Sequence, residues 1–193
     1  KKILATTTSY ATDRQQFGLP IAEFGLIQRK LADMAARAYG AESVAYRTAG
    51  LVYTAIRGMD PSKNALDVKL RTFAEYSVEC AMAKVIGSET YHGVADEALQ
   101  VYGGYGFSEE YPAARWYRDS RITRIYEGTS EICRLGIAKT ILKRSSRGEL
   151  DLGPPPLETP RSVTPEDQGL TVLRAQVDAL KSLFRFVLGE IRA

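Results

Sequence analysis

Apolar residues recur every three or four positions over most of this chain, and this spacing constrains the fold more than any other feature. The clearest run contains Ile21, Phe24, Ile27, Leu31, Met34 and Ala38, and it continues through Val44 and Leu51 to about Arg57. A period of 3.6 residues places such side chains on one face of an α-helix. We therefore predict one very long helix over residues 21–57. Strand-like alternation is weak, so we expect no β-structure anywhere.

Glycine, proline and serine residues divide the remaining periodic sequence into further helices. The segment from Gly58 to Ser62 ends the long helix, with Pro61 in the turn and Ser62 as the cap of the next helix. The paired glycines Gly103 and Gly104 are expected to end a later helix. The predicted helices are residues 1–13, 21–57, 62–86, 88–102, about 113–120 and 129–143, with 105–112 as loop. Short connections between such helices predict an all-α, antiparallel up-down helix bundle.

The composition changes after Lys143. Residues 144–149 are charged and small, and the prolines between Pro154 and Pro165 are incompatible with a continuous helix. We therefore expect three regions: a helical-bundle domain at 1–145, a Pro-rich linker at 146–164 and the start of a C-terminal helical extension at 165–193. The extension carries an apolar stripe that needs a covering segment, formed by Leu170, Leu173, Val177, Leu180, Phe184 and Val187.

Composition also excludes several classes of function. The net charge is only +3 and the basic residues are dispersed, so no nucleic-acid partner is expected. His92 is the only histidine, which excludes a histidine-based triad and a zinc site with several imidazoles. Cys80 and Cys133 lack CxxC spacing, so we expect a reducing compartment and no metal site. Apolar runs are too short to span a membrane, which leaves at most a peripheral membrane contact.

Glu127 is the first candidate for chemistry. It lies between Tyr126 and Gly128, just before Thr129 and Ser130, which are N-cap residue types at the start of the last bundle helix. Gly128 has no Cβ, so a flat cofactor or a thioester can approach the backbone there. A carboxylate enclosed by aromatic and apolar groups loses hydration of its charged form and becomes a better base near neutral pH. The alternative is that Glu127 only precedes a helix and favours its positive end.

Two further segments share an order and a spacing with this one. The three blocks are Arg14–Gln15–Gln16–Phe17–Gly18, the run Gln100–Val101–Tyr102–Gly103–Gly104–Tyr105–Gly106–Phe107, and Tyr126–Glu127–Gly128–Thr129. Together they resemble the C-terminal α-helical domain of the acyl-CoA dehydrogenases over about residues 1–145. The run Phe24–Gly25–Leu26–Ile27–Gln28 has glycine where many relatives have glutamine, and it is most similar to the very-long-chain type.

The resemblance implies a catalytic role for Glu127. The residue matches the base that removes the α-proton of a long-chain fatty acyl-CoA while the β-hydride passes to FAD, giving a trans-2-enoyl-CoA in fatty-acid β-oxidation. Its backbone N–H would share the thioester carbonyl with a flavin ribityl hydroxyl, which acidifies the α-proton. Tyr126 and Gly128 are the expected substrate-binding neighbours.

The resemblance also implies FAD contacts from all three blocks. Arg14 would pair with the diphosphate and Phe17 would stack on the adenine, both on the FAD of a neighbouring subunit. The other expected FAD contacts are Gln16, Gln100, Gly103, Gly104, Thr129 and Glu131. Each block has a simpler explanation, since Arg14 and Phe17 also fit the end of a helix and Gly103–Gly104 fits a helix C-cap.

The expected partners follow from the same resemblance. They are an acyl-CoA substrate, an electron-transfer flavoprotein as electron acceptor, and further copies of the chain in a dimer or tetramer. Two alternatives stay open: an acyl-CoA oxidase that passes electrons to oxygen, and a helical binding or assembly protein with a vestigial site. We expect the chain to be part of a longer polypeptide and inactive alone, in the cytoplasm if bacterial, or in the mitochondrial matrix or on the inner membrane if eukaryotic.

Overall fold

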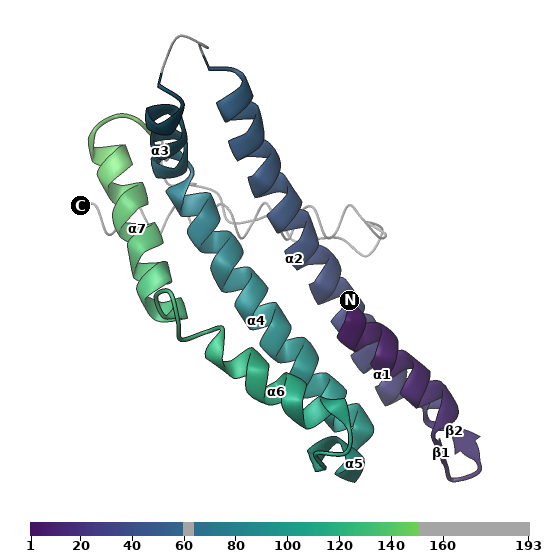
Figure 1. The fold of residues 1–193 in the computed structure, drawn as a ribbon. Helices are drawn as coiled ribbons and strands as arrows, with labels where there is room; N and C mark the ends of the chain where they lie inside the picture. Colours follow the sequence, from purple (N-terminus) through teal and green to yellow (C-terminus); the bar gives the residue numbers. More distant parts are fainter. Residues whose placement is uncertain (60–63, 151–193) are drawn as a thin grey trace, which may run out of the picture. The chain divides into compact units, whose positions relative to one another are not determined.

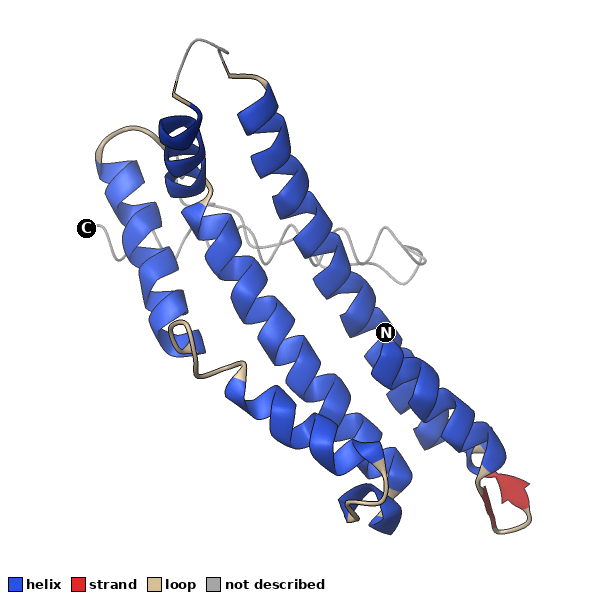
Figure 2. Ribbon diagram, in the orientation of Figure 1, coloured by secondary structure: helices blue, strands red, loops and turns tan. Residues whose placement is uncertain are grey.

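Helices dominate the computed structural model, which describes residues 1–59 and 64–150 (Figures 1 and 2). The elements are α1 (Lys2–Asp13), β1 (Gln15–Gln16), β2 (Leu19–Pro20), the 3₁₀ turn η1 (Ile21–Glu23), α2 (Gly25–Arg57), α3 (Ala65–Glu75), α4 (Ser77–Tyr102), α5 (Gly104–Phe107), α6 (Pro112–Ile122) and α7 (Ser130–Ser146). The predicted helical fold class is confirmed. No helix in these ranges has the length and apolar character needed to cross a membrane.

The packing described below lies within one compact unit, Lys1–Ile137. Helix α4 is its centre, because it packs against α1, α2 and α6. Figure 1 shows α2 and α4 side by side with opposite chain directions. Small residues on α4 allow this close approach. One core cluster joins Ala11, Ile21 and Val101, and a second joins Met34, Val94 and Ala98.

A two-residue hairpin follows α1, so the expectation of no β-structure was wrong. Gln15 pairs with Pro20 and Gln16 with Leu19 in antiparallel register. The two residues between the strands, Phe17 and Gly18, have φ of 54° and 83°. Two consecutive positive φ values match the type I′ turn that suits the twist of short hairpins. A pair of two-residue strands has no detectable alternation, and the turn lacks the usual Asn-Gly.

The predicted long helix 21–57 begins later than expected, because Ile21–Glu23 form the turn η1 and α2 starts at Gly25. The boundaries after Arg57 differ as well. The predicted helices 62–86 and 88–102 are instead a short α3 and a long α4 that part at Tyr76. Asn64 caps α3, since its side chain accepts from the Leu66 N–H at 2.9 Å. The predicted cap Ser62 and the turn at Pro61 lie outside the described residues. Ser88 does not interrupt α4, because its hydroxyl donates to the carbonyl oxygen of Val85 at 3.0 Å within the same helix.

The end of α4 was predicted correctly, but the following loop contains a helical turn. Gly103 ends α4 with φ 62°, and α5 occupies part of the segment 105–112 that was expected to be loop. Gly106 makes this turn possible: a Cβ there would lie 2.4 Å from the Leu99 carbonyl oxygen. Only glycine therefore lets α5 fold back onto the last turn of α4.

Candidate functional site

The backbone around Glu127 is strained. Glu127 lies in the segment between α6 and α7 with φ 53°, and Gly128 follows with φ 88°. A side chain in the left-handed region costs roughly 1–2 kcal/mol, and such strain gathers at functional positions. Within the described residues the Glu127 N–H makes no hydrogen bond, whereas the Tyr126 N–H donates to Ile122 O at 3.2 Å and the Ser130 N–H to Arg124 O at 3.0 Å. The loop therefore presents both a carboxylate and an unpaired donor.

Thr129 caps α7, as its residue type predicted. Its hydroxyl accepts from the Ile132 N–H at 3.2 Å, and its carbonyl oxygen accepts from the Cys133 N–H at 2.9 Å. Hydrogen bonds from the Glu131 backbone N–H and the Thr129 hydroxyl lower the pKa of the Glu131 carboxyl. Thr129 and Glu131 thus fix the start of α7 immediately after Glu127.

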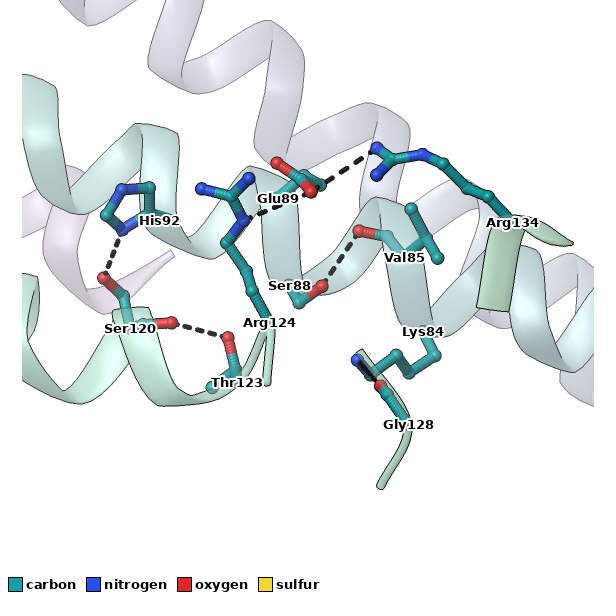
Figure 3. A network of polar contacts seen from close by, with 10 residues as sticks. All are labelled: Lys84, Val85, Ser88, Glu89, His92, Ser120, Thr123, Arg124, Gly128 and Arg134. Carbon is teal, nitrogen blue, oxygen red and sulfur yellow. Dashed lines mark hydrogen bonds and ion pairs between the residues drawn. The ribbon is translucent and has the colours of Figure 1, made fainter. Parts of the chain in front are cut away.

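Side chains of α4 hold the loop from the other side (Figure 3). Lys84 Nζ donates to the carbonyl oxygen of Gly128 at 2.7 Å. Glu89 Oε1 forms an ion pair with Arg124 Nε at 3.2 Å and accepts from Arg134 Nη2 at 3.4 Å. The sequence analysis missed Lys84 and Glu89. Their signal was the presence of ionic groups, about one turn apart, in a helix segment rich in small and apolar residues.

His92 belongs to the same polar network. Its Nδ1 lies 3.0 Å from Ser120 Oγ, whose hydroxyl donates to the carbonyl oxygen of Tyr117 at 2.7 Å. The Thr123 hydroxyl donates to the carbonyl oxygen of Ser120 at 2.6 Å. These bonds connect the last turn of α6 to α4. His92 therefore has a structural contact, at the boundary between helix surface and core.

The expected enclosure of Glu127 is absent from the part of the chain that the structure describes. Glu127 is exposed and Tyr126 is 50% exposed. Ile132 and Leu135, on the first turns of α7, are exposed as well. The role of Tyr126 beside a bound substrate stays a prediction.

A separate pocket brings the first two sequence blocks together. Its volume is about 490 Å³, and its lining is Tyr10, Arg14, Gln16, Ile21, Val101, Tyr102, Gly103, Gly104 and Tyr105. Residues far apart in the chain meet here because α1 packs on α4. Gln100 and Phe17, which we expected beside them, do not line the pocket. Gln100 contributes its carbonyl oxygen, which accepts from the Gly103 N–H at 3.1 Å.

The pocket combines one cation, aromatic rings and bare backbone. The Arg14 guanidinium lies 4.8 Å from the centre of the Tyr105 ring. The rings of Tyr10 and Tyr102 stack at 3.9 Å, and the Tyr10 hydroxyl donates to the Tyr102 carbonyl oxygen at 3.3 Å. Burial raises the pKa of both tyrosines, so they remain neutral donors. Arginine beside glycine backbone suits a phosphate, and flat rings suit a nucleobase.

Phe17 stands at the tip of the hairpin. Its side chain is 92% exposed, and among the described residues its ring makes an edge contact with Phe24 at 6.2 Å. Phe17 therefore carries two costs. Its backbone is strained by the positive φ, and its apolar ring is exposed to water. A turn formed by Asn-Gly would avoid both costs.

Comparisons with known proteins agree on one family. A profile for "Acyl-CoA dehydrogenase, C-terminal domain" matches residues 1–142. A probable acyl-CoA dehydrogenase of Bacillus subtilis is 46% identical over 158 residues, which is 79% of this chain and 26% of that protein. The mitochondrial very-long-chain specific acyl-CoA dehydrogenase of Rattus norvegicus is 41% identical over 138 residues, covering 72% of this chain and 18% of that protein.

A solved structure agrees with these sequences. The crystal structure of an acyl-CoA dehydrogenase complexed with FAD from Bacillus anthracis is similar with a TM-score of 0.84 and 39% identity, over 98% of this chain and 33% of that one. The chain thus spans at most about a third of the relatives it matches. The resemblance carried by the three sequence blocks is confirmed: this chain belongs to the acyl-CoA dehydrogenase family, and residues 1–142 match its C-terminal domain.

Proposed function

We propose that this chain serves, within a longer polypeptide, in an FAD-dependent dehydrogenase that converts a long-chain fatty acyl-CoA to its trans-2-enoyl-CoA in fatty-acid β-oxidation. The observation that carries the proposal is the Glu127 loop, in which a left-handed residue offers a carboxylate and an unpaired N–H. General bases and oxyanion donors are often separate residues, and here one residue has both groups.

Glu127 performs the proton transfer in this proposal. Its backbone N–H donates to the thioester carbonyl oxygen, which acidifies the α-carbon, and its carboxylate then takes the α-proton. Gly128, whose φ is 88°, leaves the approach to the carbonyl free of a side chain. Bound FAD would supply the acceptor for the β-hydride. After the step the proton resides on a carboxylate oxygen of Glu127.

The pocket around Arg14 fits the nucleotide end of FAD. Arg14 would pair with the diphosphate, and its guanidinium stacks over the Tyr105 ring. Gly103 and Gly104 would allow close contact between FAD and the backbone. The pocket contains no residue from Tyr126 to Glu131. This separation supports the expectation that the pocket and Phe17 serve the FAD of a neighbouring copy, so the working protein is a homo-oligomer. An electron-transfer flavoprotein is the proposed electron acceptor.

The test of the base is anaerobic mixing of the FAD-loaded, full-length protein with a series of acyl-CoAs while the flavin absorbance is recorded. We expect Glu127→Gln to slow bleaching by about 100-fold to 10,000-fold, the usual contribution of a positioned base. Glu110→Gln is the matched control, since Glu110 is an exposed carboxylate outside both sites, and it should bleach at the wild-type rate.

Other outcomes would replace the proposal. Bleaching of Glu127→Gln at the wild-type rate would place the base elsewhere, and a protein that binds no flavin would favour a binding or assembly role. Rapid reoxidation of the reduced flavin by oxygen would indicate an oxidase. The acyl-CoA with the largest bleaching rate tests the preference for long chains, which Gly25 alone supports within this chain.

A further inference from the structure

Lys84 has an unusual partner for a half-buried ammonium. Its polar contact within the described residues is the carbonyl oxygen of Gly128, 2.7 Å from Nζ. Lys30 on α2 shows the ordinary arrangement, because its ammonium pairs with the carboxylate of Glu97 on α4. A hydrogen bond from an ionised donor is roughly twice as strong as a neutral one. The contact of Lys84 therefore restrains one particular peptide group.

The held carbonyl belongs to Gly128, the residue after the proposed base. Glu127 and Gly128 are consecutive left-handed residues, with φ of 53° and 88°. Since a peptide is planar, only the φ and ψ of Gly128 separate its held carbonyl from the peptide that joins it to Glu127. The contacts of Glu89 with Arg124 and Arg134 hold the chain on either side of the turn (Figure 3). Helix α4 thus contacts the chain before the base at Arg124, next to the base at Gly128, and after it at Arg134.

We propose that Lys84 is a positioning residue for Glu127. The inference rests on the proposed function of Glu127 as the base. Lys84 acts through the Gly128 carbonyl and keeps the turn left-handed, so that the carboxylate and the N–H of Glu127 face the same thioester. Without the ammonium the turn relaxes toward ordinary backbone angles, and the carboxylate moves away from the α-carbon.

The test uses the FAD-loaded, full-length protein with Lys84→Met. We expect the anaerobic rate of flavin reduction at saturating acyl-CoA to fall roughly 10-fold to 100-fold, because small misplacements of a reacting group have effects of this size. The dissociation constant for acyl-CoA, read from the flavin spectrum, should change less than about threefold. The proposed role of Lys84 is to position the base, and it does not contribute to the binding of acyl-CoA in the ground state. Lys84→Arg keeps a charged donor and should recover most of the rate.

Lys30→Met is the matched control. Lys30 is also a half-buried lysine that contacts α4, but its partner is Glu97 rather than the loop. It should reduce the flavin at the wild-type rate. A fall as large as that of Lys84→Met would mean that loss of any half-buried lysine in contact with α4 or on it slows the reaction, and this would overturn a specific role for Lys84.

A double-mutant cycle separates failure of this inference from failure of the proposed function. If Glu127→Gln alone reduces flavin at the wild-type rate, Glu127 is not the base and both proposals fall. If Glu127→Gln is slow and adding Lys84→Met causes no further loss, Lys84 acts through Glu127 as proposed. A full further loss in that background would show an independent role and reject the positioning role alone.

Rates are normalised to bound FAD, so that loss of folded protein is not counted as loss of positioning. Where Lys84→Met fails to bind FAD, Lys84→Gln replaces it, because glutamine keeps a neutral N–H donor of similar length. Its expected rate per bound flavin is at least about threefold below wild type. A wild-type rate per bound flavin in the variant that folds overturns the proposal.

Discussion

Phe17 combines two costs in one side chain, since it is 92% exposed and has φ of 54°. Phe17→Asn would place Asn-Gly in a type I′ turn, the sequence that such turns favour. We expect a free energy of unfolding that is unchanged or higher by about 0.5–1 kcal/mol, because the left-handed strain is relieved. The affinity for FAD should fall about 10-fold, since stacking on a base contributes about 1–3 kcal/mol.

Thermal unfolding and FAD titration of the full-length apoprotein measure these two quantities separately. Leu19→Asn is the control, because Leu19 is another exposed apolar residue of the same hairpin. It should leave FAD affinity unchanged. A Phe17→Asn protein that is less stable and binds FAD normally would show that Phe17 has a structural role in the turn.

At the level of residues, the chemical types of the site were readable but their strain was not. The sequence shows Glu127 between an aromatic residue and a glycine, and Thr129 behaves as the cap that its type predicts. The positive φ of Phe17 and Glu127 has no sequence signal, because non-glycine residues rarely adopt it. Lys84 was missed for a different reason: its partner is a backbone carbonyl, which every residue has.

At the level of elements, the fold depends on the close approach of α5 to α4. A Cβ on Gly106 would lie 2.4 Å from Leu99 O and 2.8 Å from the Cβ of Tyr102. Gly106→Ala should therefore lower the free energy of unfolding by about 1–3 kcal/mol and loosen the pocket beside Tyr105. Denaturant unfolding of the full-length protein, with FAD affinity as a second readout, measures both effects.

Gly87→Ala is the matched substitution on α4, the helix onto which α5 folds back. A Cβ at Gly87 meets no atom within 4 Å, and the residue lies inside α4. Alanine is the better helix former, so stability should stay equal or rise by roughly 0.5–1 kcal/mol. Equal losses from both substitutions would show that replacing any helical glycine here lowers stability, and would reject the crowding at Gly106 as the specific cause.

Helices with a long run of periodic apolar residues could be predicted from the sequence. The prediction failed for elements with a short run. Helix α2 and the end of α4 at Gly103 follow directly from spacing and glycine placement. Gly87 and Ser88 were taken as a helix boundary, yet packing against α2 outweighs a glycine cost of about 1 kcal/mol. The break at Tyr76 was missed because no proline or glycine marks it.

At the level of the whole molecule, the proposed arrangement divides each active site between two copies. Glu127 would come from one copy, and Arg14 from its neighbour. Mixed oligomers of Glu127→Gln and Arg14→Met chains would then contain one intact site per dimer. We expect about half of the wild-type activity per mixed dimer, although each variant alone is nearly inactive. Steady-state assays on co-expressed, doubly tagged protein measure this recovery.

Mixed oligomers without activity would contradict the divided arrangement. If Arg14 and Glu127 served one FAD within a single copy, every site of the mixed oligomer would carry one substitution and no activity would return. The control is a mixture in which one chain is wild type and the other carries both substitutions. If each site is shared between two copies, no site of this control has both Glu127 and Arg14, and we expect it to be inactive.

Helix α4 also acts as a spacer of fixed length. Its residue Lys84 contacts the Glu127 loop, and its end at Gly103 lines the nucleotide pocket. At 1.5 Å per residue these points are roughly 28 Å apart along the axis, and a rigid helix also fixes the angle between them. If each active site is shared between two copies, helix α4 would set the distance between two bound flavins. A single residue inserted into it would turn one end by about 100° relative to the other and put two catalytic centres out of register at once.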